Sequence, residues 1–113
     1  MLMDKKKYSI KEIKTNVRDY ISYLKKEYHL PIEKVYLFGS YAKNNPHHYS
    51  DVDVCVVSPK FKKMDAISYL WHTLRRKDIE NLLEPMGLSP EDFRKEETPL
   101  VQEIRKNGKE IKV

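Results

Sequence analysis

The sequence has one cysteine, Cys55, and it has no long hydrophobic run. A single thiol excludes an internal disulfide framework and a cysteine-based zinc site, and its place inside a valine-rich segment favours a buried packing role over a reactive thiol. No stretch approaches the roughly 18 apolar residues that a membrane-spanning helix requires. The start of the chain also lacks the apolar core of a signal peptide. We therefore expect a soluble, cytoplasmic protein.

The sequence also has no large excess of charge of either sign. Lysine and arginine number 22 and aspartate and glutamate 17, which gives a net charge of +5 and a pI of about 9.2. A basic balance can indicate nucleic-acid binding, but Lys and Glu are interspersed along most of the chain, so the signal is weak. With 113 residues, of which 40% are hydrophobic, we expect one globular domain spanning residues 1–113.

Two short apolar segments carry the most informative polar residues. Residues 34–38 and 52–57 are rich in Val, Tyr, Leu and Phe and are bounded by turn or capping residues, so each is predicted to form a buried strand. Side chains alternate along a strand with a rise of about 3.3 Å, so Asp51 and Asp53 project from one face, roughly 6.6 Å apart at the backbone. Two carboxylates so placed repel each other unless a cation lies between them. Hard oxygen ligands suit Mg²⁺, with Mn²⁺ as the alternative ion.

Gly39-Ser40, at the end of the first predicted strand, supplies a candidate phosphate site. Glycine at a strand end lets the backbone approach a ligand closely, and Ser40 is a good N-cap for a short helix beginning at residues 41–43. Free amides at such a helix start favour an anion. A phosphate-binding turn that faces an aspartate pair indicates a nucleoside triphosphate that is bound as its metal complex.

A third strand is predicted near residues 82–86, with Pro85 limiting its length. Glu84 stands in an otherwise apolar segment of this strand, and a carboxylate in such surroundings usually has a partner. Glu80 is the rival acid, but it lies nearer the preceding helix and is more simply a surface residue.

Helix signals surround these strands. Ser9 and Glu12 form a capping box for a first helix that should end near residues 29–31. Asp65 should cap a second helix, with Arg75-Arg76-Lys77 in its last turn as a mostly solvated face and, less favoured, as a contact for triphosphate or an acidic partner. Further helices should begin at Ser89-Pro90 and Thr98-Pro99, and residues 109–113 could add an edge strand. The apolar positions expected to face the core from the second helix are Ile67, Leu70, Trp71 and Leu74.

Two adjacent histidines, His47 and His48, lie in the polar loop of residues 44–50. They could be read as metal ligands. Sequential neighbours rarely converge on one ion and no nearby carboxylate is fixed, so a solvated loop is favoured over a metal site.

The pattern as a whole resembles a known superfamily. Gly39-Ser40, followed after ten residues by Asp51-Val52-Asp53, resembles the signature of the nucleotidyltransferase superfamily that includes DNA polymerase β. The segments 37–43, 83–85 and 89–93 are similar to those of the minimal nucleotidyltransferase (MNT) family, which includes the MntA-like antitoxins of HEPN/MNT modules. The resemblance covers about residues 10–112. It implies an α+β fold, with a small mixed β-sheet packed with helices and the site at one end of the sheet.

The resemblance also implies a reaction and a set of site residues. In the family an acceptor hydroxyl attacks the α-phosphate of a nucleoside triphosphate, and pyrophosphate leaves. Two Mg²⁺ ions bridged by the aspartate pair would clamp the attacking and leaving oxygens. The third carboxylate would bind the catalytic ion or accept the acceptor's proton. The chain departs from the family by having Asn44 where Gly is common and Glu84 where Asp is common. The implied positions are Asp51 and Asp53 for the metal pair, Glu84 for the third carboxylate, and Gly39, Ser40 and Lys43 for the phosphate-binding turn.

The resemblance finally implies a partner. MNT proteins are typically paired with HEPN-domain toxins, and some transfer AMP from ATP to a tyrosine of the toxin. We therefore expect a Mg²⁺-dependent nucleotidyltransferase that uses ATP or another nucleoside triphosphate and acts as an antitoxin in a homo- or hetero-oligomer. The alternatives are a non-catalytic antitoxin that neutralises a HEPN partner by binding, and a nucleotidyltransferase of a small molecule or an RNA end.

Overall fold

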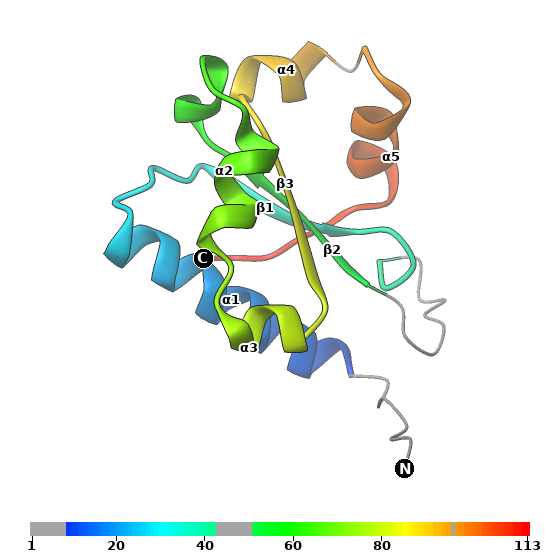
Figure 1. The fold of residues 1–113 in the computed structure, drawn as a ribbon. Coiled ribbons are helices and arrows are strands. Elements are labelled where there is room, and N and C mark those ends of the chain that lie inside the picture. Colours follow the sequence, from blue (N-terminus) through cyan, green and yellow to red (C-terminus); the bar gives the residue numbers. More distant parts are fainter. Residues whose placement is uncertain (1–8, 43–50, 96) are drawn as a thin grey trace.

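A four-stranded mixed sheet forms the centre of the protein. The structure, a computed structural model, describes residues 9–42, 51–95 and 97–113 (Figure 1). The strand order is β3-β2-β1-β4. β1 (Lys34–Phe38) is antiparallel to β2 (Val52–Val57) and to β4 (Lys109–Glu110), whereas β3 (Leu83–Leu88) is parallel to β2. The expected strands at 34–38 and 52–57 and the edge strand near the C-terminus are confirmed.

Helix α1 (Ile10–Glu27) packs on one face of the sheet. Ser9 caps it, because the Ser9 hydroxyl accepts a hydrogen bond from the Glu12 amide and the Glu12 carboxylate accepts one from the Ser9 amide. The apolar stripe of the helix contacts the inward side chains of β1 and β2, which is the pattern that its helical spacing predicts. The buried residues shared by this core are Ile13, Val17, Tyr20, Ile21, Leu24, Val35, Leu37, Val52, Val54 and Val56.

Helices α4 (Pro90–Lys95) and α5 (Pro99–Asn107) cover part of the opposite face (Figure 1). Ser89 and Thr98 cap them, since each hydroxyl accepts a hydrogen bond from an amide in the first turn. Cys55 is fully buried on this face beside Phe93 and Ile104, in keeping with the packing role expected for it. Over the described ranges, no helix is both long enough and apolar enough to cross a bilayer.

The segment after β2 differs from the expectation. A short 3-10 helix, η1 (Pro59–Lys62), leads to α2 (Ala66–Thr73), which Asp65 caps as predicted. However, Ile67 and Trp71 are 56% and 49% exposed, so the predicted core face of this helix was wrong at both positions. Leu70 remains buried, together with Ala66 and Thr73. The helix is therefore rotated so that Ala66, Leu70 and Thr73 face inward, and Ile67 and Trp71 face outward.

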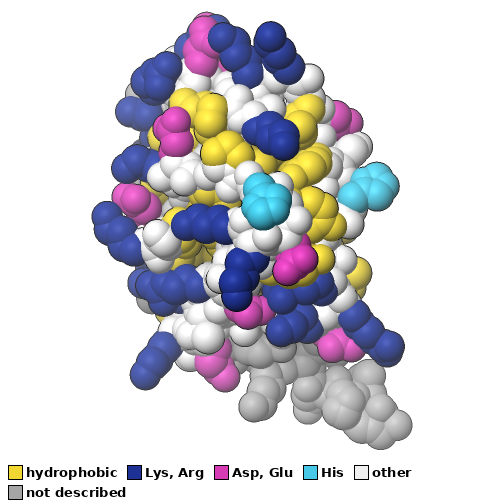
Figure 2. Space-filling view, turned by 90° about the vertical axis from the view of Figure 1, so that its left-hand side faces the viewer, with side chains coloured by type: hydrophobic (Ala, Val, Ile, Leu, Met, Phe, Trp, Pro, Cys, Tyr) yellow, Lys and Arg dark blue, Asp and Glu magenta, His cyan; other side chains and the backbone are white. Residues whose placement is uncertain are grey.

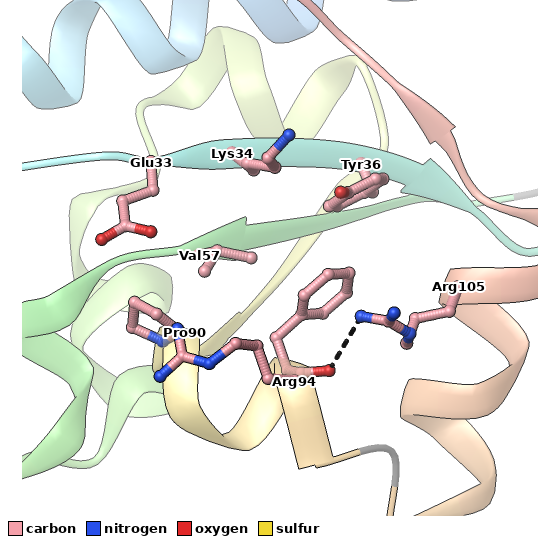
Figure 3. A pocket seen from close by; sticks show the side chains of 8 residues that line it. Glu33, Lys34, Tyr36, Val57, Pro90, Arg94 and Arg105 are labelled. Carbon is pink, nitrogen blue, oxygen red and sulfur yellow. Dashed lines mark hydrogen bonds between the residues drawn. The ribbon is translucent and has the colours of Figure 1, made fainter.

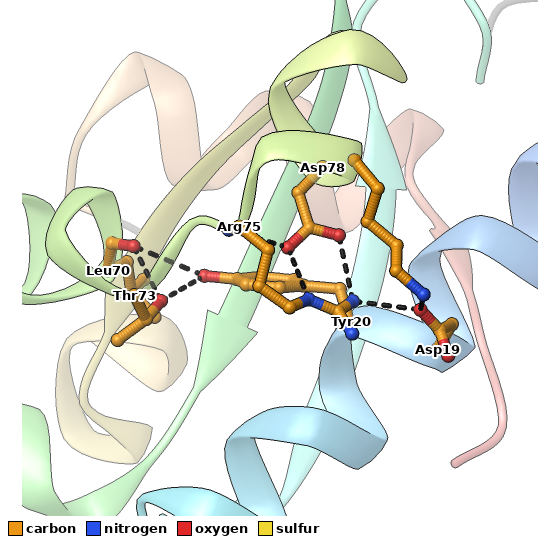
Figure 4. A network of polar contacts seen from close by, with 7 residues as sticks. Asp19, Tyr20, Leu70, Thr73, Arg75 and Asp78 are labelled. Carbon is orange, nitrogen blue, oxygen red and sulfur yellow. Dashed lines mark hydrogen bonds and ion pairs between the residues drawn. The ribbon is translucent and has the colours of Figure 1, made fainter.

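The three cations after α2 do not form its last turn. α2 ends at Thr73, and a separate helix, α3 (Arg76–Glu80), begins after Arg75. The Arg75 guanidinium makes two hydrogen bonds of 2.9 Å to the buried carboxylate of Asp78 and one of 2.8 Å to Asp19 of α1 (Figure 4). The solvated face expected for Arg75 is thus wrong, because its charge is committed to joining α3 to α1.

The third strand is longer than expected. β3 continues through Pro85 to Leu88. The carbonyls of Leu82 and Leu88 accept hydrogen bonds from the amides of Val52 and Ser58, so the backbone groups of the even-numbered residues face β2. Pro85, at an odd position, has its missing amide on the open edge of the sheet, where no ladder hydrogen bond is lost. The strand therefore does not end at the proline.

The residue that follows the C-cap of helix α1 has a strained backbone, and a substitution there tests the fold directly. His29 follows the C-cap residue Tyr28 and has a φ of 51°, a left-handed conformation that costs a side-chain-bearing residue stability. We predict that His29→Gly raises the free energy of unfolding by about 0.5 to 1 kcal/mol in urea titration. The control Glu27→Gly, in the last helical turn, should lower it by about 1 kcal/mol. Equal losses in both variants would contradict the assignment of His29.

Candidate active site

Three residues form a row across the sheet at one end of β2. Asp53 is paired with Phe38 of β1 and with Glu84 of β3. Adjacent strands lie about 4.8 Å apart, and paired residues project from the same face. The parallel pairing of β2 with β3 therefore brings the carboxyl groups of Asp53 and Glu84 together, although 30 residues separate them in the chain.

Within the described part of the chain, this pair is two acids without a counterion. Burial raises the pKa of the Asp53 carboxyl to about 7, and a hydrogen bond with the Glu84 side chain and the charges of Glu84 and Asp51 add to the shift. Such a hydrogen bond requires one of the two carboxyl groups to hold a proton. Among the described residues, no lysine or arginine contributes to the shift. The pair is therefore suited to a cation that would replace the shared proton.

Gly39 lies directly against this pair. It has a φ of 77°, and a Cβ at this position would overlap the Asp53 carboxylate. Only glycine satisfies both the left-handed backbone and the close approach. Residues 39–42 form a turn, and not the start of the short helix expected after Ser40. Tyr41, which is 2% exposed, anchors this turn in the core.

The structure distinguishes the other predicted site residues. Asp51 precedes β2, is exposed, and acts on Asp53 only through its charge. Glu80 lies on α3 and pairs with Arg76 at 3.2 Å, so Glu84 and not Glu80 is the acid beside Asp53. Lys43, together with Asn44, His47 and His48, lies outside the described residues.

Carboxylate oxygens are the donors that Mg²⁺ prefers, with water and substrate phosphates completing its octahedral shell. Across the described ranges, no group of three His, Cys, Asp or Glu side chains is already gathered around one point. The Asp53–Glu84 pair nevertheless fits a divalent ion, because both acids lie on rigid strands. Neither acid takes part in an ion pair between described residues. Asp53 and Glu84 would hold the ion, and Asp51 could join them.

A groove beside the pair was not predicted. It has a volume of about 270 Å³ and is lined by Phe38, Asp53, Ile67, Trp71, Glu84, Pro85 and Met86. In the sequence, the groove is indicated by Ile67 and Trp71. They are spaced for one face of α2 but were predicted to face the core. Because α2 turns Ala66 and Leu70 inward, Ile67 and Trp71 border the site instead.

A second cavity lies farther along the same face, between the sheet and helices α4 and α5 (Figure 3). It has a volume of about 360 Å³. Tyr36 stacks on Phe93 with ring centroids 5.0 Å apart, and Arg105 donates a hydrogen bond to the Phe93 carbonyl at 3.4 Å. Among the described residues that line it, Glu33 is the one acid, so this cavity is not the candidate metal site.

Comparison with known proteins identifies the family of the chain that has this fold and this carboxylate pair. The profile of the nucleotidyltransferase domain family matches residues 17–113. The chain therefore belongs to the nucleotidyltransferase domain family, and the resemblance drawn from Gly39-Ser40 and Asp51-Val52-Asp53 is confirmed. No curated protein matches the chain.

Three solved structures share the fold. A Sulfolobus solfataricus protein assigned as a nucleotidyltransferase has a TM-score of 0.59 and 20% identity, over 83% of this chain and 85% of that chain. A toxin–antitoxin complex solved with AMP-PNP has a TM-score of 0.58 and 23% identity, over 88% and 72%. A mutant of the toxin–antitoxin complex MntA-HpeT has a TM-score of 0.52 and 21% identity, over 93% and 73%. These likenesses confirm the expected α+β nucleotidyltransferase fold.

The raised pKa of Asp53 predicts a pH dependence of stability in metal-free buffer. Because the native pKa lies above the ordinary value of 3.8, the native state holds this proton more tightly than the unfolded chain, and its contribution to stability is lost as the pH rises from about 4 through 7. Asp53→Asn, which carries no charge, should therefore gain stability relative to wild type between pH 5 and pH 8.5. Urea unfolding at pH 5, 7 and 8.5 with EDTA measures the difference.

A control separates this effect from general titration. Hydrogen bonds from Ser68 lower the pKa of the Asp65 carboxyl, so Asp65→Ala should lose stability by an amount that stays constant from pH 5 to pH 8.5. A difference between Asp53→Asn and wild type that is equally constant would contradict the shared proton.

Proposed function

We propose that this nucleotidyltransferase domain transfers AMP from ATP to a hydroxyl acceptor, a tyrosine of a HEPN-domain toxin, and so acts as its antitoxin. The observation that carries the proposal is the Asp53–Glu84 pair beside the Gly39 turn. The fold likeness to toxin–antitoxin complexes, one of them solved with AMP-PNP, supports the partner class and the nucleotide. The single-domain organisation over residues 1–113 is part of the same proposal.

Each residue of the site has a role in this reaction. Asp51, Asp53 and Glu84 would hold two Mg²⁺ ions, or Mn²⁺, which supply charge neutralisation at the attacking and leaving oxygens. The amides of the turn at Gly39 and Ser40, with Lys43, would bind the triphosphate. The acceptor oxygen forms a bond to the α-phosphorus, the bond from that phosphorus to the bridging oxygen breaks, and pyrophosphate leaves with the electron pair. Glu84 would receive the hydroxyl proton.

A protein acceptor is favoured over an RNA end. Lysine and arginine side chains on the face shown in Figure 2 are interspersed with acidic ones, and Lys34, Lys62, Arg75, Arg76, Lys77, Lys95 and Lys112 all have acidic partners. A continuous basic surface, which is the usual footprint of nucleic-acid binding, is not formed by these residues.

We predict that ATP labelled on its α-phosphate transfers label to a HEPN-domain toxin partner in the presence of Mg²⁺, and that EDTA abolishes transfer. Asp53→Asn should reduce the rate by more than the 10–100-fold that loss of an outer-shell partner costs a metal site, because it removes a ligand itself. Glu80→Gln is the matched control and should label at the wild-type rate. The labelled partner is detected by autoradiography and by mass spectrometry.

The outcomes separate the alternatives. Full labelling by Asp53→Asn would overturn the assigned mechanism. Neutralisation of the toxin by wild type and Asp53→Asn alike, without labelling, would show an antitoxin that acts by binding. Label transferred to RNA in place of the toxin would show that the acceptor is an RNA and not a protein.

A further inference from the structure

The groove beside the carboxylate pair has the chemistry of a site for an uncharged aromatic group. Its walls are Trp71 and Ile67 from α2, Pro85 and Met86 from β3, and Phe38 from β1, and among the described residues Asp53 and Glu84 are its only charged ones. No lysine or arginine of the described part of the chain lines it. Away from the ion that Asp53 and Glu84 would hold, these walls offer a phosphate group no cationic side chain, so they do not suit the triphosphate or a nucleic-acid backbone.

The groove also lies on a defined side of the reacting centre. In the strand order β3-β2-β1-β4, the Gly39 turn follows β1 and lies on one side of Asp53, whereas β3 and α2 lie on the other. Gly39 approaches the Asp53 carboxylate directly, and Glu84, Pro85 and Met86 extend the groove from Asp53 toward α2. Apart from Phe38, which precedes Gly39 at the end of β1, the groove's lining lies at the carboxylate pair or beyond it on the side of β3 and α2.

In-line displacement determines which reactant occupies each side. The attacking oxygen and the leaving oxygen lie opposite each other at the phosphorus atom. If pyrophosphate leaves toward the Gly39 turn, the acceptor must attack from the β3 side. The ribose and base are attached through an equatorial oxygen and extend away from this line.

We propose that this groove is the acceptor site, and that it holds the side chain of a tyrosine presented by the partner protein. The inference rests on the proposed function and adds to it the residues that select the acceptor. The phenol oxygen bonds to the α-phosphorus, its proton passes to Glu84, and the bond to the bridging oxygen breaks as pyrophosphate leaves. Trp71 and Ile67 contact the aromatic ring and position it, and they are specificity-determining rather than catalytic residues.

The size and exposure of the groove agree with this occupant. Its volume of about 270 Å³ is below the roughly 300–1,000 Å³ of pockets that enclose whole small-molecule ligands, so it suits one side chain of a larger acceptor. Trp71 and Ile67 are 49% and 56% exposed. Half-exposed aromatic and aliphatic side chains of this kind are typical anchors of protein–protein contacts.

The test uses the only tryptophan of the chain, Trp71, as its own reporter. Titration of the protein with the HEPN partner should shift Trp71 emission to shorter wavelength. The partner's own tryptophans are replaced by Phe, so that Trp71 alone emits. Titration with ATP and Mg²⁺ alone should leave the emission maximum unchanged. A shift with ATP alone would show that the groove binds the base, and no shift with the partner would show that it binds no acceptor; either result overturns the proposal.

The kinetic arm keeps this inference distinct from the proposed function. Trp71→Ala should raise the KM for the partner by about tenfold or more and leave the KM for ATP unchanged, whereas Ile79→Ala, which removes an equally exposed side chain from α3, should change neither. Because Trp71 is half-exposed, thermal unfolding should confirm that the variant folds. An unchanged KM for the partner overturns the acceptor site. Absence of labelling by the wild type is instead a failure of the proposed function. In that case the fluorescence result alone decides whether the groove binds the partner.

Discussion

The forced proximity of two carboxyl groups is the constraint on which the site depends. Asp53 and Glu84 are neighbours because β2 and β3 pair in parallel in a register that sets them opposite each other, and β2 is packed on both faces. A slip by one residue would exchange the side chains of these two faces and turn Asp53 toward the core that contains Val52, Val54 and Val56. The sheet therefore holds the two acids together despite their repulsion. The hydrophobic core thereby maintains an electrostatic conflict that a proton relieves and that a divalent ion would relieve better.

Local signals predicted the parts of this fold that local interactions determine. The capping hydrogen bonds of Ser9, Asp65, Ser89 and Thr98 each span three residues, and the periodicity of 34–38 and 52–57 sufficed for two strands. The break between α2 and α3 was missed because Arg75 is held by Asp19, which lies 56 positions away in the chain. Pro85 was expected to limit the third strand to residues 82–86, but β3 runs to Leu88, because the effect of a proline depends on which side of the strand faces its neighbour.

The site was predictable to the same degree. Strand parity placed Asp51 and Asp53 on one face, and the apolar surroundings of Glu84 marked it as a candidate acid. Parity treated Asp51 and Asp53 alike, whereas the structure leaves Asp51 exposed and half-buries Asp53. The groove could not be predicted, because it depends on how closely α2 approaches β3. A Cβ at Gly87 would lie 2.6 Å from the Phe61 ring and 2.8 Å from Ala66, so this glycine is what permits that approach. Trp71 and Ile67 then border the carboxylates.

The central claim is that Asp53 and Glu84 together form a divalent-metal site. Its most direct test is titration with Mn²⁺ at pH 8, with bound metal read by electron paramagnetic resonance, in wild type, Asp53→Asn, Glu84→Gln and the control Glu80→Gln. We predict that the wild type and the control bind Mn²⁺ with the same affinity and that either substitution in the pair weakens binding by more than about tenfold. Equal binding by all four proteins would contradict the account.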